Sequence, residues 1–209
     1  MSYTKPLRQI SIGQKGREMG LLVLLFSLLT IQAAVGFAEE SKDPGLRGRL
    51  LGMLSGYEYI PSELEVKALG PGVLEVLMEI AEDPEVLLFR QVRAVSLLGY
   101  FSGSEVNGYL RGVVGKQDQK RILVQTGLRS LARSGGVGSI GFIEGYLKSE
   151  DRFVRSAAIE ALGSIPENSA VEVLERARTN ETEPFLKEKY DVTLERLQLR
   201  NKEETSSSE

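Results

Sequence analysis

The amino-acid sequence predicts an all-α fold, an α-solenoid of stacked antiparallel helix pairs that form an α-α superhelix. The clearest pair lies in residues 151–177, where apolar residues recur at helical spacing on both sides of a Ser-Ile-Pro-Glu-Asn break at 164–168. A single pair of this size leaves its apolar faces in water, so we expect it to be one copy of a stack.

The chain also matches itself at a period of 31 to 33 residues. Residues 154–163 align with 123–132 and with 90–99, and each copy has Ala or Gly four residues before a Leu. The second helices align on four equivalent positions, Leu77, Leu110, Ile143 and Leu174. Periods of this length are typical of solenoids built from helix pairs.

One copy carries a recognisable motif. With one residue of drift, it fits the pattern D-x-x-V-R-x-x-A-x-x-A-L-G through Asp151, Val154, Arg155, Ala158, Ala161, Leu162 and Gly163. The motif resembles the short HEAT-type repeat of the bilin-lyase-like class. The resemblance covers residues 73–174 and implies an armadillo-like helical solenoid. It does not imply an enzyme, because most such repeats are scaffolds.

Gly and Pro breaks divide the chain into its expected elements. Helices are predicted at 46–55, 62–69, 73–81, 86–100, 105–114, 120–133, 138–147, 152–163, 169–178 and 183–200. Ser-x-x-Glu capping boxes mark two of the starts, at Ser62 and Ser169. The last helix suits a cap with a polar outer face, because five apolar residues share its inner register: Phe185, Leu186, Tyr190, Leu194 and Leu197. The solenoid domain is thus predicted at 46–200, followed by a polar tail at 201–209.

The first 38 residues are typical of an export signal. Four basic residues precede an apolar run at 19–31, and Gly36-Phe37-Ala38 supplies the small residues that a signal peptidase reads. Cleavage after Ala38 leaves a tether at 39–45 and an extracytoplasmic protein, periplasmic or secreted. The alternative is a retained single-pass anchor, since 19–38 is long enough to cross a bilayer.

Composition narrows the function classes. The chain has no Cys, so its stability is expected to come from stacked helices. Loss of the leader removes four basic residues and Glu18, and the net charge changes from −3 to −6. An acidic domain is a poor nucleic-acid binder, so we expect a protein or peptide partner, and a membrane contact only if the leader is retained.

The absence of His removes the commonest general base and the commonest metal ligand. It also rules out the paired His-Glu motifs of HEAT-type di-iron hydroxylases, so no cofactor or metal is predicted. The carboxylates of Glu75, Glu79, Glu172 and Glu175 are expected to be solvated helix residues. For Arg93, Asp151 and Arg155 we expect structural ion pairs at the turns. A bilin-lyase-like activity, or another enzyme using surface carboxylates, stays open as an alternative.

The two central second helices each contain G-x-x-x-G on the face turned away from the core. Their glycines are Gly108, Gly112, Gly141 and Gly145, and each costs a helix about 1 kcal/mol relative to Ala. One explanation is that the glycines relieve crowding between adjacent second helices, or that they arose by drift in a chain with stability to spare. The functional one is that bare backbone on the concave surface admits a partner helix or extended peptide, oriented by Arg111, Glu144 and Lys148.

The sequence therefore predicts an exported, non-catalytic scaffold or adaptor that binds a protein or peptide on its concave face. A membrane-anchored assembly factor that keeps its N-terminal helix is the second alternative.

Overall fold

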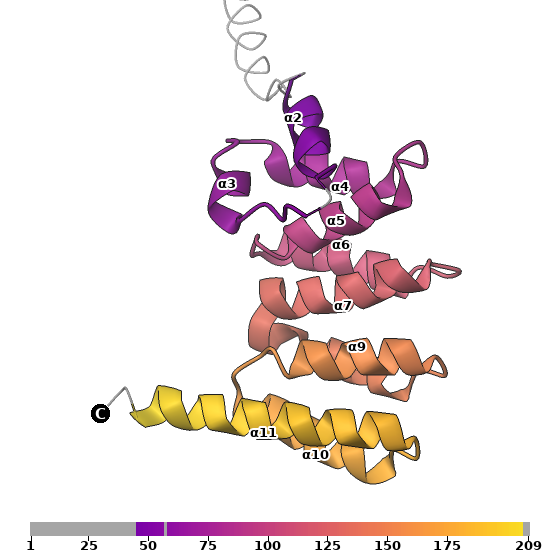
Figure 1. Cartoon of the computed structure of the whole chain (residues 1–209), viewed down its shortest axis with the longest axis vertical. Helices are drawn as coiled ribbons and strands as arrows, with labels where there is room; N and C mark the ends of the chain where they lie inside the picture. Colours follow the sequence, from indigo (N-terminus) through magenta and orange to yellow (C-terminus); the bar gives the residue numbers. More distant parts are fainter. Residues whose placement is uncertain (1–44, 57, 207–209) are drawn as a thin grey trace, which may run out of the picture. The chain divides into compact units, whose positions relative to one another are not determined.

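Stacked helices make up the described part of the chain, residues 45–56 and 58–206, in this computed structural model (Figure 1). The chain divides into two units, Met1–Ser41 and Lys42–Glu209, and every described residue belongs to the second. The predicted leader and all of the tether except Gly45 therefore lie outside the described residues. Within the described ranges, no helix combines the length and the apolar character needed to cross a bilayer.

The helices follow one another in antiparallel pairs. Their order is α2 (Leu46–Met53), α3 (Glu63–Lys67), α4 (Val73–Glu82), α5 (Leu88–Leu98), α6 (Ser104–Gly115), α7 (Arg121–Gly135), η1 (Gly136–Ser139), α8 (Ile140–Glu144), η2 (Gly145–Lys148), α9 (Arg152–Leu162), α10 (Asn168–Asn180) and α11 (Pro184–Ser206). The described residues contain no strand. The predicted α-solenoid is confirmed.

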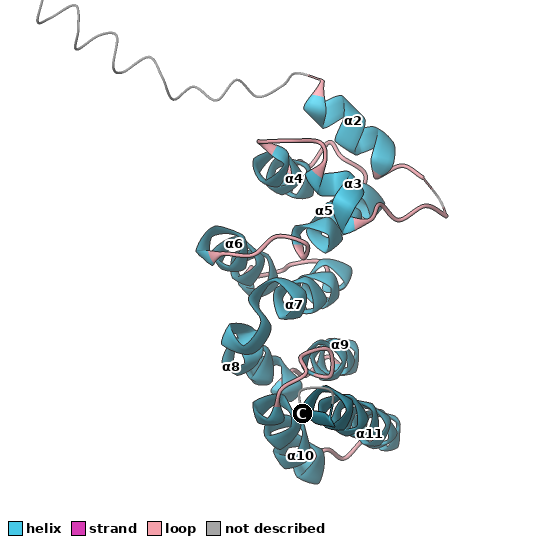
Figure 2. Cartoon of the chain, turned by 90° about the vertical axis from the view of Figure 1, so that its left-hand side faces the viewer, coloured by secondary structure: helices cyan, strands magenta, loops and turns pink. Residues whose placement is uncertain are grey.

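Two rows of helices form the stack. The first row consists of α5, α7, α9 and α11, and the second row consists of α4, α6, α8 and α10 (Figure 2). The core lies between the rows. The four positions aligned in the second helices, Leu77, Leu110, Ile143 and Leu174, are all fully buried there, as the repeat predicts. First-row residues such as Ala94, Leu128 and Ala158 belong to the same core and are equally buried.

Local sequence signals start two of these helices where expected. Ser62 caps α3 by accepting the N–H of Glu65 at 3.3 Å, and the Glu65 carboxylate accepts the Ser62 N–H at 2.8 Å. Asp151 caps α9, because its carboxylate accepts the Phe153 N–H at 2.8 Å. The second predicted capping box is wrong. Helix α10 begins at Asn168, so Ser169 lies inside its first turn and makes no cap bond.

The first row packs more closely than the second. Consecutive first-row helices contact one another extensively, whereas contacts along the second row are sparse. Glycines permit this approach: a Cβ at Gly99 would lie 3.1 Å from the Ser130 Cα, and a Cβ at Gly163 would lie 2.1 Å from the Thr193 Cγ2. The stack consequently bends with the first row on its inner side and the second row on its outer side (Figure 2).

The helix predicted at 138–147 is broken into η1, α8 and η2. Helix α7 ends at Gly135, and Gly136 has φ +47°, which turns the chain before the next helix can start. Gly138, Gly141 and Gly145 then weaken helix propagation, so a five-residue α-helix remains between two 3-10 turns.

The C-terminal end also differs from the prediction. Helix α11 continues to Ser206, so residues 201–206 are helical and do not form the predicted tail. Leu186, Tyr190, Leu194 and Leu197 are buried, as their register predicts, but Phe185 is 61% exposed.

Candidate interaction surfaces

The four predicted glycines lie on open helix surface. Gly108 and Gly112 belong to α6, Gly141 to α8 and Gly145 to η2. A Cβ built at any of them would meet no atom within 4 Å, so crowding does not explain them. They do leave bare backbone exposed. Because the second row forms the outer side of the bend (Figure 2), the prediction that this face is concave is wrong.

The polar residues predicted to flank the glycines are partly used within the fold. Arg111 donates to the Gly138 carbonyl at 3.0 Å and lies 5.2 Å from the centroid of the Phe142 ring. Glu144 pairs with Arg176 at 2.7 Å. Lys148 is exposed at the rim of a cavity of about 480 Å³ next to Arg155. Whether this face binds a partner stays a prediction.

The first row carries a second, unpredicted surface. An exposed apolar residue stands at the second position of each first-row helix, and we call these four residues the apolar ladder. They are Phe89 (47% exposed), Ile122 (41%), Phe153 (43%) and Phe185 (61%). In sequence they recur with the same 31- to 33-residue period as the repeats. The ladder thus runs along the stack, one step per helix.

At its N-terminal end the ladder opens into an apolar cavity of about 790 Å³. Its lining comes from the loop after α2 and from α5 and α7: Ser55, Gly56, Leu88, Phe89, Val92, Arg93 and Ile122. Arg93 fixes that loop, since its guanidinium donates to the carbonyls of Leu54 at 3.2 Å and Tyr59 at 2.6 Å. The cavity therefore has one wall from the loop after α2 and another from α5 and α7, which carry the first two ladder residues.

Three of the four first-row helices are strongly basic. Together α5, α7 and α9 contain seven arginines and one carboxylate, Glu160. In the second row, α4 alone has three carboxylates and no basic residue. These three first-row helices thus carry positive charge in a chain whose net charge is −3.

Several of these arginines have structural partners, as predicted for the turn residues. Arg155 donates to Glu181 at 3.1 Å and to the Ser149 carbonyl at 2.8 Å. Asp151 caps α9 and pairs with Arg121 at 2.6 Å. Arg93, in contrast, holds loop carbonyls and not a carboxylate. The arginine Arg152 forms no ion pair within the described residues and contacts the Phe153 ring at 4.9 Å.

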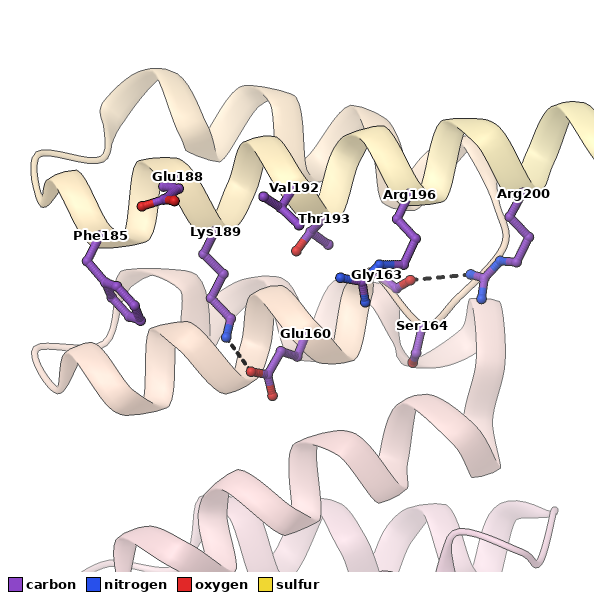
Figure 3. Close-up of a pocket in the computed structure, with 10 residues that line it drawn as sticks. All are labelled: Glu160, Gly163, Ser164, Phe185, Glu188, Lys189, Val192, Thr193, Arg196 and Arg200. Carbon is purple, nitrogen blue, oxygen red and sulfur yellow. Dashed lines mark hydrogen bonds and ion pairs between the residues drawn. The ribbon is translucent and has the colours of Figure 1, made fainter.

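A third cavity, of about 540 Å³, lies between α9 and α11 (Figure 3). Lys189 pairs with Glu160 across it, and Arg200 donates to the Gly163 carbonyl at 3.3 Å. Burial opposes ionisation of Glu160, but hydrogen bonds from Lys189 and Arg129 outweigh it and lower the pKa of this carboxyl. An ionised, ion-paired carboxylate of this kind is a poor general acid or base near neutral pH.

Glu181 behaves similarly. Burial acts to raise its pKa, but the backbone N–H groups of Glu183 and Thr182, together with Arg155, lower it overall. The predicted solvated carboxylates Glu172, Glu175 and Glu79 are exposed, and Glu75 is half-buried. Among the described residues, no group of three or more acidic, His or Cys side chains is placed to hold a metal ion.

Comparison with known families agrees with the helical pairs. Residues 117–190 match the family model for HEAT repeats. This HEAT segment runs from the turn before α7 into α11 and contains Ile122, Phe153 and Phe185 of the ladder. No curated protein was found to match the sequence. The ladder was not predicted from the sequence, because Phe185 shares the helical register of core residues. The available signal was the 31- to 33-residue period that the four ladder residues share.

Proposed function

We propose that this protein is a non-catalytic scaffold or adaptor that binds a protein or peptide partner on the inner, first-row face of its solenoid. HEAT repeats are commonly protein-interaction scaffolds. The observation that carries the proposal is the apolar ladder, because four exposed apolar residues stand at equivalent positions of successive first-row helices. Exposed apolar residues gathered in this way mark interaction sites.

The proposal includes export. Support comes from the sequence of residues 1–38, in which a basic stretch precedes an apolar run and a small-residue cleavage site. The mature protein is then extracytoplasmic and begins at Glu39. A retained anchor would make it a membrane-tethered assembly factor instead. N-terminal sequencing of the protein from its native cell distinguishes the two, because the anchored form keeps residues 1–38.

The enzyme alternative has less support. A carboxylate that acts as a general acid or base at neutral pH needs a pKa raised toward 7. The pKa values of Glu160 and Glu181, which line two of the cavities, are shifted in the opposite direction. The similarity of the Asp151–Gly163 motif to repeats of the bilin-lyase-like class therefore supports a shared fold more than a shared reaction.

Site-specific photo-crosslinking in the native cell tests the scaffold function. A photoreactive amino acid replaces Ile122 in the ladder, and the matched control replaces Leu64, which is 81% exposed in α3. We expect one reproducible protein adduct from position 122 and none from position 64. Adducts at neither position, or the same adducts at both, would contradict binding through the first-row face.

A further inference from the structure

We propose that the apolar ladder binds an extended, acidic polypeptide segment with an apolar side chain at every third residue. This inference rests on the proposed scaffold function and adds the chemistry of its partner. The partner's apolar side chains would contact the ladder and fill the 790 Å³ cavity beside Phe89, and its carboxylates would face the first-row arginines.

The spacing of the ladder favours an extended segment. Packed helices lie about 8–10 Å apart, so successive ladder residues are separated by about that distance along the stack. A polyproline II segment advances about 9 Å in three residues and returns each third side chain to the same face. The ladder repeats one exposed apolar residue per helix, whereas an amphipathic helix presents an apolar stripe that covers a broad arc of its surface.

Charge on the inner face favours an acidic partner. Of the seven arginines in α5, α7 and α9, four have no carboxylate partner in the described part of the chain: Arg90, Arg93, Arg133 and Arg152. Arg90 lies 5.5 Å from the Phe89 ring, and Arg152 lies 4.9 Å from the Phe153 ring. These two cations therefore accompany the apolar ladder itself, where a partner carboxylate next to an apolar side chain would meet them.

Carboxylates also lie in the turns before these helices, at Glu85, Asp118, Glu150 and Asp151. Asp151 already pairs with Arg121, and Glu160, the one carboxylate of the first-row helices from α5 to α9, pairs with Arg129 and Lys189. The preference for an acidic partner therefore rests on Arg90 and Arg152, whose guanidinium groups lie against ladder rings and have no carboxylate partner in the described residues.

The same surface fits a nucleic acid or a membrane less well. The cavity is lined by the aliphatic residues Leu88, Val92 and Ile122, which suit an apolar side chain better than a phosphate. A bilayer surface is broad, and the helices that carry the ladder form the inner side of the bend (Figure 2). A single polypeptide strand can follow that curve.

Fluorescence anisotropy with labelled synthetic peptides and the full-length chain tests the inference. The probe is a repeated Leu-Glu-Ser peptide of about 12 residues, long enough to span four ladder steps. Its controls are the Leu-Lys-Ser and Ser-Glu-Ser peptides of the same length and a single-stranded oligothymidine. The protein variants are Phe153→Ser, Ile122→Ser and Arg152→Glu, with Val137→Ser as the matched control, since Val137 is 53% exposed in η1.

We expect the Leu-Glu-Ser peptide to bind and the three controls to bind at least about tenfold more weakly. Phe153→Ser and Ile122→Ser should each weaken binding about tenfold, and Val137→Ser should leave it unchanged. Arg152→Glu should weaken binding of the acidic Leu-Glu-Ser peptide and strengthen binding of the basic Leu-Lys-Ser peptide. The thermal unfolding of each variant is first compared with that of the parent protein. If one of Phe153→Ser and Ile122→Ser fails to fold, the other still measures the contribution of the ladder to binding.

Equal binding of the acidic and basic peptides would overturn the inference, as would tighter binding of oligothymidine or a loss of binding confined to Val137→Ser. If the peptide does not bind but position 122 still crosslinks to a partner, the partner chemistry is wrong and the scaffold function stands. If both experiments fail, both proposals are wrong.

Discussion

The two rows of helices use glycine in opposite ways. In the first row, Gly99 and Gly163 lie against Ser130 and Thr193 of the next helix, where a Cβ would collide with the neighbour. In the second row, Gly108, Gly112 and Gly141 face open space. The same residue type therefore permits a close helix contact in one row and leaves exposed backbone in the other.

The rows also differ in surface chemistry. The first row combines exposed apolar residues with arginines, whereas the second row has exposed glycines and, in α4, three carboxylates. A difference of this kind within one repeated structure indicates that the two faces have different roles. The predictions that follow test it, starting with the largest expected effect.

The first prediction concerns the close approach of α9 and α11. Gly163→Ala should reduce the free energy of unfolding by about 1–3 kcal/mol, because overpacking displaces the Thr193 side chain, which lies 2.1 Å from the added Cβ. Urea unfolding of the variant measures the change. The double variant Gly163→Ala, Thr193→Ala should recover part of the loss. An unchanged Gly163→Ala midpoint would show that α11 can shift freely, and the account of the bend would then be wrong.

A second prediction concerns the ion pair between α9 and the turn before α11. The Arg155 side chain is 14% exposed and its partner Glu181 is 7% exposed. Arg155→Ala should lower the free energy of unfolding by about 2 kcal/mol, because it leaves a buried carboxylate without its cation. Arg121→Ala is the matched control: its pair with Asp151 is more exposed, and we expect a loss of under about 1 kcal/mol. Equal losses in the two variants would contradict the difference in burial.

Acid should weaken the same region. The pKa values of Glu160 and Glu181 are lowered in the fold, so the unfolded chain binds more protons at acid pH. Their contribution is present above the unfolded Glu pKa of about 4.3 and is lost as pH falls through the lower folded values. Urea midpoints measured from pH 6 to pH 3 should fall in the parent protein and fall less in Arg155→Ala. An equal slope in both proteins would contradict the assignment for Glu181.

The repeat and its core could be predicted from the sequence, because apolar residues at core positions recur with the period of an α-helix. Leu77, Leu110, Ile143 and Leu174 are equivalent in the chain and equally buried in the fold. The direction of the bend could not be predicted in this way, because it depends on how closely the helices of each row pack. The sequence does not show that Gly163 meets Thr193 of another helix whereas Gly112 meets open space.

The candidate site was predicted less well for a related reason. Phe185 shares a helical register with Leu186 and Tyr190, so the pattern assigns it to the core, whereas packing leaves it exposed. Arg111 and Glu144, which were predicted to orient a bound partner, instead form contacts within the fold that the sequence does not specify. Whether an apolar residue is exposed or belongs to the core depends on the residues packed around it. The packing of the helices, and not the sequence pattern, shows which residues those are.

The smallest effect is expected in the second row. Gly108→Ala and Gly112→Ala should each raise the free energy of unfolding by about 0.5–1 kcal/mol, because Ala favours the helix and meets open space. Changing Gly108, Gly112, Gly141 and Gly145 together to Leu should leave the protein folded. If that variant loses its partner while Phe153→Ser retains it, the glycine face is the binding surface and the first-row proposal is wrong.

Methyl NMR of the full-length chain with the acidic Leu-Glu-Ser peptide tests the central claim most directly. The two reporters are Ile122 in the ladder and Val137 in η1, and their side chains are similarly exposed. Ile122 belongs to the first row, whereas Val137 lies in the 3-10 turn that leads into α8 of the second row. The account predicts a saturable shift of the Ile122 methyl signals with those of Val137 unchanged. A shift of Val137 with Ile122 unchanged would contradict it.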